Sequence, residues 1–132
     1  MTDVHHVTIS IRREPAEVYA FVSDPKNLPT WAAGLAGAKV HREGDEWVTE
    51  SGALGKVHIK FAAKNAFGVA DHDVRLPSGD TVHNPLRVLP HGGDSEVVFT
   101  LFRAPGVTDD KLLEDKRAIE KDLATLKQQL ER

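Results

Sequence analysis

Apolar and polar residues alternate strictly at the start of the chain. Val7, Ile9 and Ile11 fall on one side of an extended segment, and the polar residues between them fall on the other side. A period of two is typical of a strand with one buried and one solvated face. We therefore predict a strand over residues 4–11.

Two short helices are predicted after this strand. Pro15 suits the first position of a helix, and Asp24, which precedes a proline, is a good N-cap for a second helix that Pro29 limits in length. Apolar residues share one face of each segment, namely Val18, Phe21 and Val22 in the first and Leu28, Trp31 and Leu35 in the second.

The middle of the chain changes to short β-prone runs separated by turn residues. Glycine, proline and aspartate mark the breaks, one of which is a turn over residues 51–55. Because no helical pattern lies between the runs, consecutive strands are expected to pair in an antiparallel meander. The predicted strands cover residues 39–42, 46–51, 56–64, 69–76, 81–89 and 95–103.

The last segment has the pattern of one long helix. Thr108, followed by Asp109 and Asp110, combines a hydroxyl N-cap with negative charge near the positive end of the helix dipole. Apolar residues recur at helical spacing at Leu112, Ile119, Leu123, Leu126 and Leu130. The spacing predicts a helix over residues 109–132 that packs across the sheet. A dimer contact and a membrane-surface helix are the alternatives; the mixed charges argue against an anionic membrane, and core packing is the default for such a helix.

This order of elements, together with several sequence segments, resembles a known superfamily. The segments are 7–11, 14–19, 24–31 and 99–103, of which the stretch from Asp24-Pro25 to Trp31 is the most specific. They are similar to the START-like (SRPBCC, helix-grip or birch-pollen-allergen-like) superfamily, in particular its bacterial polyketide cyclase/dehydrase-type branch. The resemblance implies an α+β helix-grip fold in one domain over residues 1–132. Its curved antiparallel seven-stranded sheet would carry two short helices and one long C-terminal helix.

The resemblance also implies a ligand cavity between the sheet and the long helix. Members of the superfamily bind lipids, sterols or polyketides, cyclise aromatic precursors, or act as protein-binding modules. The resemblance also implies a place for Trp31 at the mouth of such a cavity, where its indole would gate a ligand; simple packing in the core is the alternative. Ten residues are predicted to bind the ligand: Trp31, Phe61, His72, Val74, Val82, Asn84, Leu86, Phe99, Ile119 and Leu123.

The register of one hairpin can be predicted from its pattern. A three-residue loop over residues 77–79 pairs Val74 with Val82 and gathers the apolar side chains on one face. A two-residue loop would instead bring Arg87 onto the buried face. We therefore predict the first register, which places the side chains of His72 and Asn84 opposite each other on the apolar face.

Two interpretations of this polar pair are open. Buried polar groups need hydrogen-bond partners, so His72 and Asn84 either satisfy each other in the core or face a ligand hydroxyl or carbonyl. In an enzyme, His72 would be the catalytic acid or base, and Asn84 would hold a carbonyl or enolate oxygen. Asp71 and Asp73 project to the other face of the strand, which argues against a carboxylate–imidazole dyad.

Composition excludes several classes of function. The 132 residues include 17 Lys and Arg against 20 Asp and Glu, a net charge of −3 without a basic cluster, so no nucleic-acid partner is predicted. No apolar run approaches the roughly 20 residues of a membrane span, so no membrane insertion is predicted. Cysteine is absent and the histidines lack metal-ligand spacing, so neither a metal nor another cofactor is predicted. We expect a cytoplasmic protein.

Three functions are compatible with these features. The first is the binding of a small hydrophobic molecule, such as a lipid, a polyketide-like compound or an aromatic one, between sheet and helix. The second is a cyclase or dehydratase that acts on a polyketide-like substrate through His72. The third is a protein-interaction module. A homodimer is kept open as the assembly.

Overall fold

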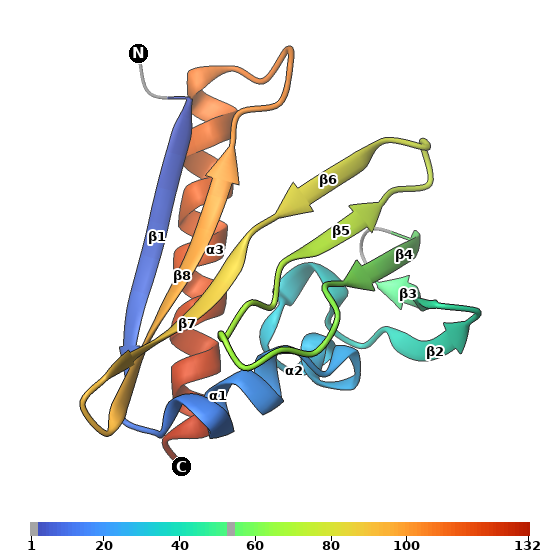
Figure 1. The fold of residues 1–132 in the computed structure, drawn as a ribbon. Helices are drawn as coiled ribbons and strands as arrows, with labels where there is room; N and C mark the ends of the chain where they lie inside the picture. The colour runs from blue at the N-terminus through green and yellow to red at the C-terminus, as the bar shows by residue number, and fades with distance from the viewer. Residues whose placement is uncertain (1–2, 53–54) are drawn as a thin grey trace.

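A computed structural model describes residues 3–52 and 55–132, and it shows an α+β fold with antiparallel sheets and a long C-terminal helix (Figure 1). The helices are α1 (Pro15–Val22), α2 (Leu28–Trp31) and α3 (Asp109–Leu130), with 3-10 turns η1 (Pro25–Asn27) and η2 (Ala33–Leu35). The strands are β1 (Val4–Ile11), β2 (Lys39–Glu43), β3 (Glu46–Gly52), β4 (Gly55–Phe61), β5 (His72–Arg75), β6 (Thr81–Asn84), β7 (Leu86–His91) and β8 (Asp94–Phe102). The turn predicted over residues 51–55 lies partly outside the described residues.

The prediction of one seven-stranded sheet was wrong. The strands form a three-stranded sheet in the order β1-β8-β7 and a five-stranded sheet in the order β2-β3-β4-β5-β6. The cause is Pro85, which divides the predicted strand over residues 81–89 into β6 and β7. Proline has no N–H for the ladder, and only its carbonyl oxygen is bonded, to the N–H of Thr100 at 3.0 Å.

The two sheets stay joined through the segment before β5. The N–H of Val88 donates to the carbonyl of Gly68 at 2.9 Å, and the N–H of Ala70 donates to the carbonyl of Leu86 at 2.8 Å. Gly68 has a φ of 73°. This segment therefore lies against β7, whereas β5 itself pairs with β4 and β6.

The long helix begins as predicted, since the Thr108 hydroxyl accepts a hydrogen bond from the N–H of Lys111 at 3.1 Å. It does not cross one continuous sheet. Figure 1 shows α3 running along β1 behind the three-stranded sheet, while the five-stranded sheet diverges from it. Helices α1 and α2 lie at the end of the molecule where the chain terminates. No helix in the described ranges is long and apolar enough to cross a membrane.

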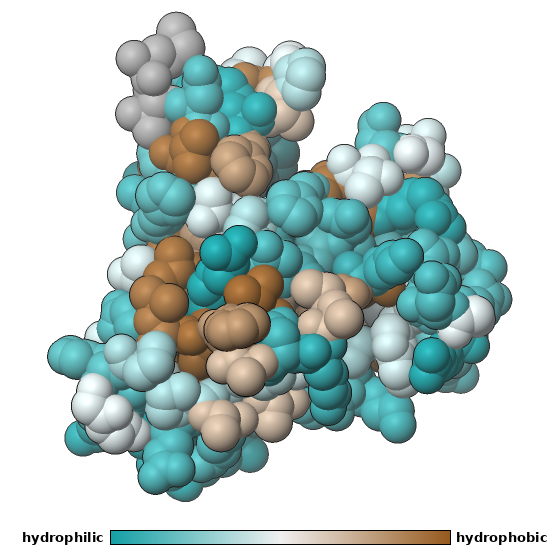
Figure 2. Space-filling model, viewed as in Figure 1, coloured by the Kyte–Doolittle hydropathy of each residue, from teal (hydrophilic) through white to brown (hydrophobic). Residues whose placement is uncertain are grey.

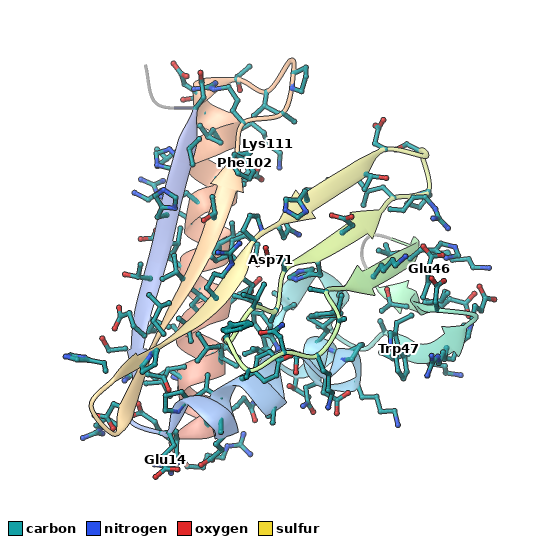
Figure 3. The ribbon with its side chains drawn as sticks, in the orientation of Figure 1. Glu14, Glu46, Trp47, Asp71, Phe102 and Lys111 are labelled. Carbon is teal, nitrogen blue, oxygen red and sulfur yellow. The ribbon has the colours of Figure 1, made fainter. Side chains whose placement is uncertain are left out.

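The predicted register of the β5–β6 hairpin is confirmed. Val74 pairs with Val82, and His72 pairs with Asn84. The N–H of Leu76 donates to the carbonyl of Asp80 at 2.9 Å and closes the loop. As the alternation requires, His72 is buried. On the other face, Asp71 (labelled in Figure 3) forms a salt bridge with Arg87 at 2.8 Å, and Asp73 forms a hydrogen bond with His83 at 2.6 Å.

Candidate functional site

The candidate site is an apolar cavity of about 340 Å³ between the five-stranded sheet, the α2–η2 segment and α3. The α2–η2 segment contributes Leu28, Trp31, Ala32, Gly34 and Leu35. The strands contribute Ile59, His72, Val74, Val82, Asn84 and Phe99, and the residue after β5 contributes Leu76. Helix α3 contributes Ile119, Asp122 and Leu123. Val82, which is 41% exposed, marks a side where the cavity opens to solvent.

The α2–η2 wall is fixed by local capping and by side-chain packing. The Asp24 carboxylate accepts a hydrogen bond from the N–H of Lys26 at 3.0 Å and starts η1, as predicted. The turn then continues into α2, where Leu28, Trp31 and Leu35 are all buried. Trp31 also has a buried Nε1–H without a hydrogen-bond partner in the described part of the chain.

His72 is the most deeply buried ionisable group of the cavity wall, with 6% of its surface exposed. Its ring stacks on Phe61 at a centroid distance of 4.8 Å and meets the ring of Phe99 edge-on at 6.4 Å. Nδ1 lies 3.1 Å from the carbonyl oxygen of Ala70. Because a carbonyl only accepts, Nδ1 carries the proton, and Nε2 keeps its lone pair without a partner among the described residues.

The environment of His72 favours the neutral imidazole. Burial lowers its pKa from the ordinary 6.5, and this effect outweighs the opposing influence of the Ala70 carbonyl and of Asp71 and Asp73. At neutral pH the ring is therefore uncharged, with one nitrogen available to accept a proton or a hydrogen bond.

Asn84 lies beside His72 on the neighbouring strand and is half-buried. The two side chains form no hydrogen bond with each other, since His72 uses the backbone of its own strand instead. The arrangement differs from a core pair whose members satisfy each other. Asn84 is a residue of the cavity wall, and its amide forms no hydrogen bond with a residue of the described ranges.

The sequence patterns did not reveal a third polar group of the wall, Asp122. One of its carboxylate oxygens, Oδ1, accepts a hydrogen bond from the N–H of Ala33 at 3.1 Å, which ties α3 to η2. Burial raises the pKa of this carboxyl from its ordinary 3.8, opposed by the Ala33 N–H and by Lys121. A usable signal was present, because Asp122 follows Ile119 by three residues and so continues the apolar face of the helix.

Eight of the ten predicted ligand-binding residues line this cavity, and two do not: Phe61 and Leu86. Phe61 stacks on His72 and faces a second hollow beside Trp47, where the Lys26 ammonium lies 5.9 Å from the Trp47 ring centroid (Figure 3). Leu86 is fully buried in the core. The lining residues that were not predicted come mainly from α2–η2. The alternation of apolar and polar residues does not specify how far this segment lies from the sheet.

Another hollow lies on the outer surface, between α1 and the loop over residues 62–71. It is lined by Tyr19, Asn65, Phe67, Val88 and Pro90, among others. Phe67 is 82% exposed, and apolar side chains gather in the middle of this face (Figure 2). The Asn65 side chain organises the loop by accepting from the N–H groups of Phe67 and Val69.

Solved structures with the same fold are known. DynU16, a putative protein of the dynemicin biosynthetic locus, is 14% identical with a TM-score of 0.75, covering 99% of this chain and 48% of its own. The chain thus spans about half the length of DynU16. The Aha1 dimer from Colwellia psychrerythraea is 15% identical with a TM-score of 0.71, covering 98% and 96% of the two chains. Ara h 8.0201 is 14% identical with a TM-score of 0.69, covering 96% of each. At these identities the likeness shows the fold alone.

The family, in contrast, is shown by the sequence. No curated protein matches the chain. The model of one protein family does match, over residues 2–131, which is nearly the whole length. The resemblance read from the strand, the Asp24-Pro25 to Trp31 stretch and the leucine-striped helix is thereby confirmed. The chain belongs to the family described as "Polyketide cyclase / dehydrase and lipid transport".

Proposed function

We propose that the protein binds a small apolar molecule in the cavity between the five-stranded sheet and α3. The observation that carries the proposal is a cavity of about 340 Å³ whose wall is apolar except for a few polar groups. This volume is within the range of roughly 300–1,000 Å³ that small-molecule sites occupy. Burial of apolar ligand surface would supply affinity at about 25 cal/mol per Å².

The polar groups of the wall support the same function. The Nε2 of His72 and the amide of Asn84 form no hydrogen bond with a residue of the described ranges. Unpaired polar groups in an apolar wall are unfavourable unless a ligand or water satisfies them. These groups would orient a ligand that carries a hydroxyl or a carbonyl.

Binding of 1-decanol, followed by isothermal titration calorimetry, tests the proposal. Ile119→Trp fills the cavity from α3 and is expected to weaken binding by about tenfold or more, because the indole takes the volume of the ligand. Leu113→Trp is the matched control, since Leu113 is on the same helix, is 43% exposed and does not line the cavity. Equal affinity in the two variants would show that 1-decanol binds elsewhere or not specifically.

Catalysis by His72 is the second candidate function. It is favoured by the hydrogen bond from Nδ1 to the Ala70 carbonyl, which leaves Nε2 as the basic nitrogen of a neutral imidazole. Nε2 could take a proton from the carbon next to a ligand carbonyl while the Asn84 amide donates to the oxygen that gains the negative charge. Deuterium exchange into 2-decanone, measured by NMR, would be accelerated by the wild type and not by His72→Gln. If both proteins, or neither, accelerate exchange while 1-decanol binds, the protein is a carrier.

The third function, a protein-interaction module, is favoured by one surface feature. Phe67 is 82% exposed at the rim of the outer hollow. A solved structure with this fold is of a dimer. A homodimer of this chain stays a prediction.

A further inference from the structure

The proposed function leaves the charge of the ligand open, and the ionisable groups of the cavity wall bear on it. We propose that the cavity selects an uncharged or cationic amphiphile with a hydrogen-bond donor, a hydroxyl or an amine, and rejects carboxylates and phosphates. The group responsible is the carboxylate of Asp122, a residue of the cavity wall. This inference rests on the proposed function, because it concerns the ligand of the same cavity.

The Asp122 carboxylate has unused capacity to accept hydrogen bonds. Oδ1 accepts from the N–H of Ala33 at 3.1 Å, and Oδ2 has no partner in the described ranges. No Lys, Arg or His of these ranges forms a salt bridge with it, in contrast to Glu131 at the C-cap of the same helix, which pairs with Lys127 at 2.7 Å. An ionised carboxylate only accepts hydrogen bonds, so the group that satisfies Oδ2 must be a donor.

The rest of the wall offers no positive charge that would compensate an anion. Among the residues that line the cavity in the described part of the chain, none is Lys or Arg. The one imidazole, that of His72, is kept neutral by burial. Lys121 neighbours Asp122 along α3 and acts on its carboxyl, but it is exposed and does not line the cavity.

The energetic consequence is a difference in affinity between ligands of the same shape. A carboxylate headgroup in this cavity would lie near a like charge in a low-dielectric environment, or would bind only with uptake of a proton by Asp122. Burial raises the pKa of the Asp122 carboxyl, which makes that uptake easier as the pH falls. A hydroxyl or an ammonium group would donate to Oδ2 and gain a charge-assisted hydrogen bond. Specificity would thus come from an element that repels the wrong ligand.

Three probes of equal chain length separate these cases: 1-decanol, decylamine and decanoate. Calorimetric titration at about pH 8 keeps the amine cationic, the acid anionic and Asp122 ionised. We expect the wild type to bind 1-decanol and decylamine about tenfold or more tightly than decanoate. In Asp122→Asn, which retains an oxygen for the Ala33 N–H, decanoate is expected to approach 1-decanol in affinity, and decylamine to bind about fivefold less tightly.

Glu120→Gln is the matched control, because it removes an exposed carboxylate two positions away on the same helix and outside the cavity wall. It should keep the wild-type order of the three probes. The comparison of the three probes on the wild type does not depend on whether any variant folds. Decanoate binding as tightly as 1-decanol to the wild type, or unchanged decanoate affinity in Asp122→Asn, would overturn the selectivity and leave the proposed function standing. Binding of none of the probes to the wild type would overturn both.

Discussion

At the scale of single residues, His72 couples the pH of the solution to the stability of the fold. Its pKa is lowered from 6.5 chiefly by burial, so the unfolded chain takes up a proton more readily than the folded one. The stability that the neutral ring contributes is therefore present above pH 6.5. It is lost as the pH falls from 6.5 toward the lowered pKa of the folded protein.

Urea denaturation at about pH 7.5 and about pH 5.5 would measure this loss. In His72→Gln, which cannot be protonated, we expect a smaller decrease of the unfolding free energy between the two conditions. His91→Gln is the control, since His91 is exposed at the end of β7. An equal pH dependence in His72→Gln and in the wild type would mean that the imidazole is not held neutral.

At the scale of elements, the join between the two sheets depends on Gly68. Its φ of 73° is a conformation that side chains with a Cβ rarely adopt, and a Cβ added there would clash with the Val88 carbonyl oxygen. Gly68→Ala is therefore expected to lower the free energy of unfolding by about 2 kcal/mol or more. Gly79 also has a positive φ, of 93°, but nothing lies within 4 Å of its added Cβ.

The comparison of Gly68→Ala with Gly79→Ala separates the clash from the backbone strain. Gly79→Ala should lower stability by only about 1 kcal/mol, because the φ alone is unfavourable there. Urea denaturation of both variants provides the two values. If the two variants lose equal stability, the close contact of Gly68 with β7 contributes nothing to the connection between the two sheets.

The elements also show which features the sequence could predict. The alternation around Val74 and Val82 set the hairpin register because a slip of one residue would have buried Arg87. The same alternation continues in phase through Pro85, so it defined the faces correctly and concealed the break between β6 and β7. Asp122 was not predicted to line the cavity, because the buried face of the helix was defined from its apolar residues alone. The spacing of Asp122 from Ile119 places it on that face, whereas its hydrogen bond with Ala33 of η2 is a tertiary contact that the spacing does not predict.

At the scale of the whole molecule, the cavity lies where two layers diverge. On one side is the five-stranded sheet, and on the other is α3, which runs along the three-stranded sheet (Figure 1). Residues of both layers line the cavity, so a ligand held there would contact both of them. At a concentration of about 100 times its Kd, a ligand that binds only the folded state adds about 2.7 kcal/mol to stability.

Hydrogen–deuterium exchange with and without 1-decanol locates this stabilisation. We expect slower exchange in two segments that are distant in sequence, β5 and the part of α3 around Ile119 and Leu123, because the ligand packs between them. A ligand in the outer hollow would instead slow exchange in α1 and in the loop over residues 62–71, since that hollow is lined by Tyr19 and Phe67. Protection confined to this second pair of segments would show that the ligand binds outside the cavity. It would also contradict the roles assigned to His72 and Asp122. Joint protection of β5 and α3 would instead require one ligand to bridge the two layers.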